Sequence, residues 1–311
     1  MTPRLAALSI DLDALRHYHR IHGLPDPPAA AGLDPVYGEA VERFGELCAR
    51  LGLRGTAFAV GEELAEPAAA AGAAALARAG HELGNHTFSH DYALTRRSRE
   101  EIEEEVRRGA QAIAAATGAA PAGFRAPGYT VTAPLLDALR AQGYRYDSSA
   151  FPAPPYWLAK AAVMGGLALL GRPSRAILDR PRALLAPRAP YRADPAEPYR
   201  RARAGEDALL ELPVTTGLFG FPLVGTFVAT FPPALLGALR AGTARLPLFN
   251  LELHGVDLLD ASDASPGLAA RQRDLRVPAA AKIARIERFV RSLADREWVT
   301  LEDAARRLGA G

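Results

Sequence analysis

Cysteine is almost absent from this 311-residue chain, since Cys48 is the only one. A disulfide framework is therefore excluded, and the composition is consistent with a reducing compartment. Long apolar runs are missing too, because none reaches the roughly 18 residues that a membrane-spanning helix needs. The first residues also lack the charged and apolar segments of a secretory signal. We therefore expect a cytoplasmic protein.

The chain has little excess charge of either sign. It contains 37 Lys and Arg residues against 35 Asp and Glu residues, a formal net charge of +2. This balance gives no reason to expect nucleic acid as a partner. Hydrophobic residues make up 49% of the chain, which excludes disorder as a description of the whole.

Short apolar runs that predict strands alternate with longer segments that predict helices. Two helix starts are marked by local signals: Asp34 followed by Pro35, and a capping box from Ser98 to Glu101. Strands are expected at 5–12, 55–60, 81–84, 123–125, 144–147, 209–215 and 248–253, helices at 37–51, 67–79, 98–117, 132–142 and 279–294, and a last strand and helix around 298–308. Such alternation predicts an α/β protein with a parallel sheet. Seven or eight units in this length predict a single domain, residues 1–311, folded as a distorted (β/α)7–8 barrel.

Residues 151–205 interrupt the alternation and form an irregular insertion. An apolar run at 157–170 is broken only by Lys160, and nine arginines with three acidic residues follow at 172–203, a local net charge of +6. The apolar run is either an extra helix packed on the barrel or a segment lying in a membrane interface beside its arginines. Prolines rather than aromatic residues separate the arginines, which argues against nucleic-acid binding.

Residues able to do chemistry fall where the predicted strands end, as catalysis on a barrel requires. Two carboxylates, two residues apart on a strand, face the same way, and two histidines lie four residues apart after the third strand. Two histidines and a carboxylate are a common ligand set for zinc or another divalent ion, and a further carboxylate and histidine can act as base and acid. This combination of histidines and carboxylates indicates metal-assisted hydrolysis of an amide or ester. The residues are Asp11, Asp13, His86, His90, Arg125, Asp147 and His254.

In this order the motifs resemble those of the polysaccharide deacetylases, the NodB-homology hydrolases. The resemblance runs from Leu8 to about Leu308 and is weakest across the insertion. It rests on five segments, each at the end of a predicted strand: Ser9–Asp13, His86–His90, Arg125–Tyr129, Asp147–Ser149 and Leu251–His254. The fold that the resemblance implies, a distorted barrel of about seven βα units, agrees with the alternation.

The resemblance implies a role for each of these residues. Asp13, His86 and His90 would bind a divalent metal, with Zn²⁺ as the expected ion. Asp11 would be the general base, held ionised by Arg125, and His254 the general acid, oriented or charge-tuned by Asp147. Substrate binding would fall to Gly128, whose backbone N–H would stabilise the oxyanion, and to Tyr129.

Three departures from the family pattern stand out. Leu12 separates two aspartates that are adjacent in many members, so the base and ligand assignments of Asp11 and Asp13 could be exchanged. Tyr129 occupies the position of a motif glycine. A tryptophan that usually accompanies the aspartate motif has no clear counterpart, and Trp157 is the nearest candidate.

The four other histidines are not expected to bind the metal. His81 is expected to be a packed, hydrogen-bonded histidine rather than a ligand. His17, His19 and His22 are expected in a loop close to the mouth of the barrel, where one of them could contact the substrate or all could be solvated.

The function implied is removal of an N-acyl group, acetyl or formyl, from an amino sugar. Lipid-linked sugar deformylases of the same superfamily carry an Asp-x-Asp first motif and a later proline-valine-threonine segment, to which 211–216 (ELPVTT) is similar. This favours a glycolipid intermediate met at the inner face of the membrane, with peripheral membrane contact. The alternative is a non-catalytic barrel that binds a glycan or a membrane surface, which a missing metal ligand would indicate.

Overall fold

The structure, a computed structural model, describes residues 4–27, 32–169 and 181–309. Within this part of the chain, seven parallel strands form one curled sheet in the spatial order β7-β5-β4-β3-β2-β1-β8. Their bounds are β1 (Leu5–Asp11), β2 (Thr56–Ala59), β3 (Glu82–Asn85), β4 (Gly123–Phe124), β5 (Tyr146–Asp147), β7 (Leu210–Glu211) and β8 (Leu248–His254). Two short strands complete the sheet: β6 (Tyr191–Arg192) runs antiparallel to β7, and β9 (Glu297–Trp298) pairs with the start of β1.

The two ends of the curled sheet are joined by hydrogen bonds rather than by a strand ladder. The backbone N–H of Thr215, just beyond β7, donates to the carbonyl of Asn250 on β8 over 3.1 Å. The N–H of Asn250 in turn donates to Oγ1 of Thr215 over 2.7 Å. The predicted distorted (β/α)7–8 barrel is thus confirmed: in the described residues seven parallel strands follow one another from β7 to β8, and β9 runs parallel beside β1.

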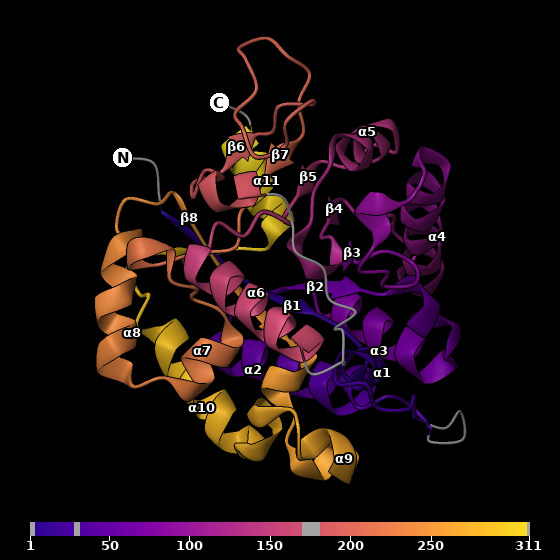
Figure 1. Ribbon diagram of the computed structural model, residues 1–311, viewed down its shortest axis with the longest axis vertical. Helices are drawn as coiled ribbons and strands as arrows, with labels where there is room; N and C mark the ends of the chain where they lie inside the picture. Colours follow the sequence, from indigo (N-terminus) through magenta and orange to yellow (C-terminus); the bar gives the residue numbers. More distant parts are fainter. Residues whose placement is uncertain (1–3, 28–31, 170–180, 310–311) are drawn as a thin grey trace.

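The helices follow the strands around the outside of the sheet (Figure 1). Ser98 caps α4 as predicted, because its Oγ accepts from the N–H of Glu101 and the Glu101 carboxylate accepts from the N–H of Ser98. Asp34 accepts hydrogen bonds from the N–H groups of Val36 and Leu15, and so ties the start of the next helical segment to α1. The helices are α1 (Leu15–Ile21), α2 (Val41–Leu51, preceded by a π-helical turn at Val36–Ala40), α3 (Pro67–Arg78), α4 (Arg99–Thr117), α5 (Ala133–Ala141), α6 (Pro154–Leu169), α7 (Gly225–Thr230), α8 (Pro233–Arg240), α9 (Pro266–Ala269), α10 (Ala279–Arg291) and α11 (Leu301–Gly309).

The segment after Asp13 is helical, which corrects the expectation of a loop. His17, His19 and His22 lie on or just after α1, and the first two are buried. His19 is held between the carbonyl of Pro25 and the hydroxyl of Ser265. The seven residues of α1, LRHYHRI, have too little hydrophobic periodicity to predict a helix from sequence; packing against the barrel stabilises it.

The insertion contains helix α6, a 3-10 turn at Pro181–Leu185 and strand β6. Trp157 near the start of α6 is buried, and its indole N–H donates to the carbonyl of Phe151 over 2.9 Å. Further along α6, Leu158, Val163 and Leu169 are 67%, 62% and 91% exposed. The helix thus packs on the barrel through Trp157, while apolar side chains along its length, from Leu158 to Leu169, are exposed to solvent. No helix in the described residues has the length and apolarity to cross a membrane.

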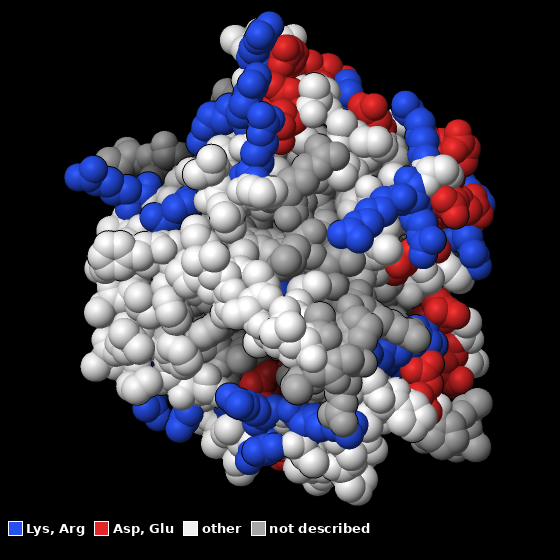
Figure 2. Space-filling view, viewed as in Figure 1, with Lys and Arg blue, Asp and Glu red and all other residues white. Residues whose placement is uncertain are grey.

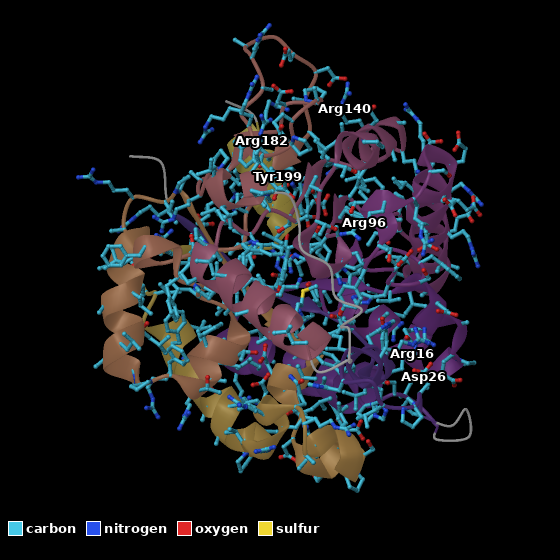
Figure 3. The ribbon with its side chains drawn as sticks, in the orientation of Figure 1. Arg16, Asp26, Arg96, Arg140, Arg182 and Tyr199 are labelled. Carbon is cyan, nitrogen blue, oxygen red and sulfur yellow. The ribbon has the colours of Figure 1, made fainter. Side chains whose placement is uncertain are left out.

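The arginine tract is only partly described. Arg172, Arg175 and Arg180, like Leu170 and the side chain of Leu167, lie outside the described residues. Arg182, which follows the gap, lies near Tyr199 beside β6 (Figure 3) and pairs with Glu197. Arg188 donates to three backbone carbonyls and a threonine hydroxyl, and Arg192 donates to two carbonyls. Several arginines of the tract therefore serve the packing of the insertion.

Candidate active site

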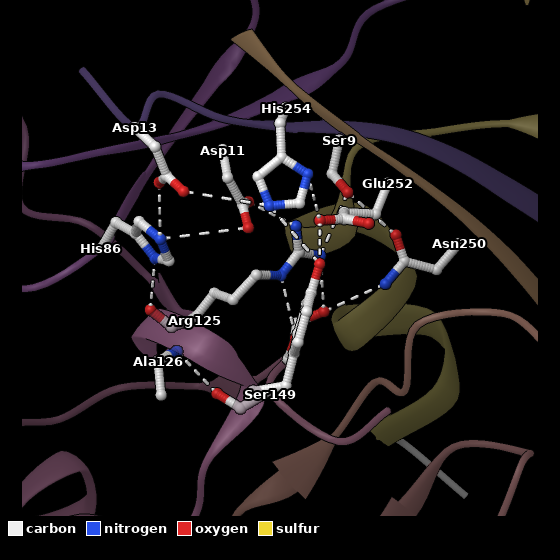
Figure 4. A network of polar contacts seen from close by, with 12 residues as sticks. Ser9, Asp11, Asp13, His86, Arg125, Ala126, Ser149, Asn250, Glu252 and His254 are labelled. Carbon is white, nitrogen blue, oxygen red and sulfur yellow. Dashed lines mark hydrogen bonds and ion pairs between the residues drawn. The ribbon is translucent and has the colours of Figure 1, made fainter. Parts of the chain in front are cut away.

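The predicted site residues gather at the carboxyl ends of the parallel strands. Asp11 is the last residue of β1 and Asp13 lies two residues beyond it, so their side chains project to the same side. Figure 4 shows how the side chains from these strand ends converge. The other contributors are His86 just after β3, Arg125 just after β4, Asp147 at the end of β5 and His254 at the end of β8.

Asp13, His86 and His90 form one buried cluster. Oδ1 of Asp13 lies 3.1 Å from Nε2 of His86 and 3.0 Å from Nε2 of His90. His90 has a left-handed backbone, with φ of 57°, and its N–H is held by Oγ1 of Thr87, whose φ is 69°. The backbone of the loop after β3 is thus locally strained, and this conformation turns His90 back toward the aspartate.

These three residues fit a divalent cation. Nδ1 of His86 lies 2.7 Å from the carbonyl of Arg125, so the ring proton sits there and Nε2 is left with a free lone pair. Among the described residues, Oδ1 of Asp13 and both ring nitrogens of His90 are buried without a hydrogen-bond partner. Burial lowers the pKa of His90 to about 4, so its ring is neutral at physiological pH. Imidazole nitrogens and a carboxylate oxygen that converge in a buried site are a common ligand set for a divalent metal ion.

Asp11 is held by Arg125. Nη1 of Arg125 donates to Oδ1 of Asp11 over 2.6 Å, and the rest of the guanidinium, which is fully buried, donates to Ser9 and Ser148. This arrangement leaves Oδ2 of Asp11, 4.0 Å from Nε2 of His86, on the side of the metal cluster. The contacts assign Asp13 rather than Asp11 to the metal cluster, because only Asp13 contacts both histidines.

His254 is tuned by Glu252, and this corrects the role predicted for Asp147. Nδ1 of His254 lies 3.2 Å from Oε1 of Glu252, which also accepts a 2.6 Å hydrogen bond from the hydroxyl of Tyr129. Burial lowers the pKa of His254, but the negative charges of Glu252, Asp13 and Asp11 raise it more, to about 9. The imidazole is therefore protonated at neutral pH, and Nε2, 3.5 Å from the Tyr129 hydroxyl, carries a proton that can be given away.

Asp147 contacts other groups. Its Oδ1 accepts a 2.5 Å hydrogen bond from Ser149, whose hydroxyl in turn accepts from the N–H of Ala126 next to Arg125. Burial raises the pKa of Asp147 to about 6, and burial with the nearby charge of Asp147 raises the pKa of Glu211 well above its usual range. Asp147 therefore supports the loop that carries Arg125 rather than His254.

Glu252 was missed from the sequence, although a signal for it exists. It stands two residues before His254 on β8, and residues i and i+2 of a strand face the same way. Two ionisable groups on one face of a buried strand indicate that they interact, and this pattern could have identified Glu252.

Gly128 and Tyr129 lie at the wall of the same site. Both have left-handed backbones, with φ of 67° and 64°, and both line the cavity above the metal cluster. A side chain at 129 thus brings a hydroxyl to Glu252, which a glycine at this position could not do. The oxyanion role of the Gly128 N–H stays a prediction.

The remaining histidines are either packed in the interior of the protein or line the cavity. His81 accepts a hydrogen bond from the N–H of Gly55 over 3.0 Å, as expected of a packed histidine. The His17 ring stacks on His90 at 4.2 Å between centroids and takes no place in the metal cluster. His22 lines the cavity and lies 2.8 Å from the amide oxygen of Gln272.

Replacing Glu252 by glutamine should move the pH dependence of turnover. The carboxylate is the largest cause that raises the pKa of His254, so its loss lowers that pKa and the acid loses its proton at lower pH. We expect the alkaline limb of the kcat profile to move down by about one unit or more. Tyr129→Phe, which keeps the charge, is the matched control and should move the limb less. An unchanged limb in Glu252→Gln would show that the pair does not control His254.

The fold and this cluster define a barrel in which Asp13, His86 and His90 are placed to hold a metal ion, with Asp11 and His254 beside them. Residues 25–146 match the family model described as polysaccharide deacetylase, which agrees with the predicted resemblance over that part of the chain. A solved structure of a Mycobacterium smegmatis protein assigned as a polysaccharide deacetylase superposes with a TM-score of 0.62 at 18% identity, covering 100% of this chain and 92% of that one. The structure of Puue allantoinase gives a TM-score of 0.60 at 16% identity, covering 99% and 91%. These likenesses show the shared fold. No match was found among curated protein sequences.

Proposed function

We propose that this protein is a divalent-metal-dependent hydrolase that removes an acetyl or formyl group from the nitrogen of an amino sugar, free or linked to a lipid. The observation that carries the proposal is the convergence of Asp13, His86 and His90 beside an independent base, Asp11, and an independent acid, His254. The family model supports carbohydrate deacetylation as the reaction class. The complete ligand set supports catalysis over a barrel that only binds its ligand.

The reaction adds water across the amide C–N bond. Oδ2 of Asp11 takes a proton from the attacking water as its oxygen bonds to the amide carbon. The C–N bond then breaks, and Nε2 of His254 gives its proton to the departing nitrogen, so that a free amine and acetate or formate result. A cation bound by Asp13, His86 and His90 would polarise the carbonyl and lower the pKa of water. Arg125 keeps Asp11 aimed at the reaction centre, and Glu252 keeps His254 protonated.

The direct test is product release from N-acyl sugars. Chelator-treated protein, with and without added Zn²⁺, is incubated with N-acetyl- and N-formylglucosamine and with their alkyl glycosides, and acetate, formate and free amine are measured. Metal-dependent release is expected, and protein carrying Asp11→Asn and purified in the same way controls for contaminants. If metal-loaded protein releases no acid from any of these substrates, the proposed function is wrong.

The proposal places the protein in the cytoplasm, with peripheral contact at the inner face of the membrane. Leu169, 91% exposed at the end of α6, supports an interfacial contact, and Figure 2 shows a broad face with few charged side chains over the region of α6 and α7. Binding to vesicles that contain phosphatidylglycerol should weaken as salt rises and should decrease in Leu169→Asp. Intact protein that fails to co-sediment at low salt would overturn the membrane contact, and cell fractionation tests the location.

A further inference from the structure

A cavity of about 470 Å³ opens above the metal cluster. Its polar floor is made of catalytic residues, among them Asp11, Asp13 and His254. Its walls are built mainly from aliphatic and aromatic side chains of α1, α6, α7 and the segment that leads into α7, although Lys160, Gln272 and Asp274 also line the cavity. Representative wall residues are Ile21, Tyr156, Val163, Met164, Val224 and Phe227.

The wall formed by α6 is fixed at its base. The Tyr156 ring packs against Phe151 at 5.1 Å and edge-on to Tyr129 at 6.1 Å, which connects α6 to the residue that holds Glu252. The Trp157 indole is anchored to the carbonyl of Phe151. Two turns further on, Val163 and Met164 reach the cavity from a helix whose position is set by these contacts.

Val163 lines the cavity while 62% of it remains exposed. An apolar side chain on the rim of a site gains free energy when an apolar group of the ligand covers it. The hydroxyls of a sugar chain would lose hydrogen bonds to water against Val163, Met164 and Phe227, because these apolar side chains offer no strong replacement partners. The wall therefore discriminates between an apolar group and a further sugar unit.

We propose that the substrate carries an alkyl or aryl group next to its N-acylated sugar, and that this group packs against Val163, Met164 and Phe227. The inference rests on the proposed function and specifies its substrate class: a single acylated sugar with an apolar aglycone, in preference to an internal residue of a polysaccharide. The floor binds the amide and the wall binds the aglycone.

The experiment compares kcat/KM for three substrates of metal-loaded protein: the methyl and octyl glycosides of N-acetylglucosamine, the latter below its micelle concentration, and the N-acetylglucosamine tetramer. Each fully buried methylene is worth roughly fourfold in affinity. We therefore expect the octyl glycoside to exceed the methyl glycoside by about tenfold or more, and the tetramer to fall below both.

Two variants of the same helix locate the effect. Val163→Asp places a charge on the wall and should reduce the octyl-to-methyl ratio at least about fivefold. Leu158→Asp, at an exposed position that does not line the cavity, should leave the ratio unchanged. A ratio near one in the wild type, a tetramer preferred over the octyl glycoside, or equal ratios in both variants overturns the inference while the proposed function stands. Failure to hydrolyse any of the three substrates or their N-formyl counterparts overturns the proposed function, and the inference with it.

Discussion

Asp11→Asn and His254→Ala should each lower turnover by about two to four orders of magnitude, the usual contribution of a general base or acid. The loss corresponds to about 3 to 5 kcal/mol of transition-state stabilisation. Asparagine keeps the shape of Asp11 and its hydrogen bond from Arg125 but cannot accept the proton of water. Alanine at 254 removes the only proton donor that faces the departing nitrogen in our account. Steady-state kinetics on the best amide substrate measures both effects.

Both variants should keep the metal, because neither residue contacts both histidines of the cluster. Metal content after dialysis is therefore the control for each. If Asp11→Asn loses the metal while Asp13→Asn retains it, the roles of the two aspartates are exchanged, which is the alternative that the intervening Leu12 raises.

His90→Ala should abolish both metal-dependent activity and metal-dependent stabilisation. A cation that binds only the folded protein at 100 times its Kd stabilises it by about 2.7 kcal/mol, and this increment raises the Tm of the wild type. Removal of one of three buried ligands should eliminate the increment, since the two remaining ligands hold the ion far more weakly. Thermal unfolding with and without Zn²⁺ measures the difference.

His81→Gln is the matched control for that experiment. His81 is a mostly buried histidine bound to the N–H of Gly55 and lies outside the metal cluster, so the variant should keep the full rise in Tm on metal addition. Equal rises in His90→Ala and in the wild type would show that the stabilising ion binds elsewhere.

The sequence predicted the barrel well because its strands are buried and bounded by strong local signals. The capping box at Ser98 and the long apolar strand at β8 each act within a few residues, so they can be recognised without tertiary information. The strands at β4, β5 and β7 are only two residues long in the structure, since the curled sheet pairs them over a short register. The short helices α7, α8 and α9, of six, eight and four residues, were not predicted, because so few residues carry little hydrophobic periodicity and such helices depend on packing.

The metal cluster was predicted because each of its members lies in a recognisable motif, whereas the partner of His254 was not predicted. Several buried carboxylates lie near the site, and family order favoured Asp147. Only the three-dimensional arrangement shows that Asp147 contacts Ser149 on its own strand end, while Glu252 contacts His254. The positions of Asp147 and Glu252 in the sheet decide which of these two buried carboxylates contacts His254. The spacing of motifs along the sequence does not reveal those positions.

The insertion was predicted as two alternatives because composition alone cannot distinguish a packed helix from an interfacial one. The buried Trp157 agrees with a helix packed on the barrel, and the exposed far end of α6 keeps an interfacial contact as a proposal. The apolar cavity wall that α6 supplies could not be derived from the sequence, since it depends on where the helix crosses the site.

The most direct test of the account is the position of the metal ion. Crystals of the protein grown with Zn²⁺ and measured at the zinc absorption edge should give an anomalous peak about 2.0–2.2 Å from Nε2 of His86, from Nε2 of His90 and from a carboxylate oxygen of Asp13. Asp11 and His254 should flank the peak without binding it. A zinc peak at another position, or no peak with the three side chains ordered and zinc in excess, would contradict the account.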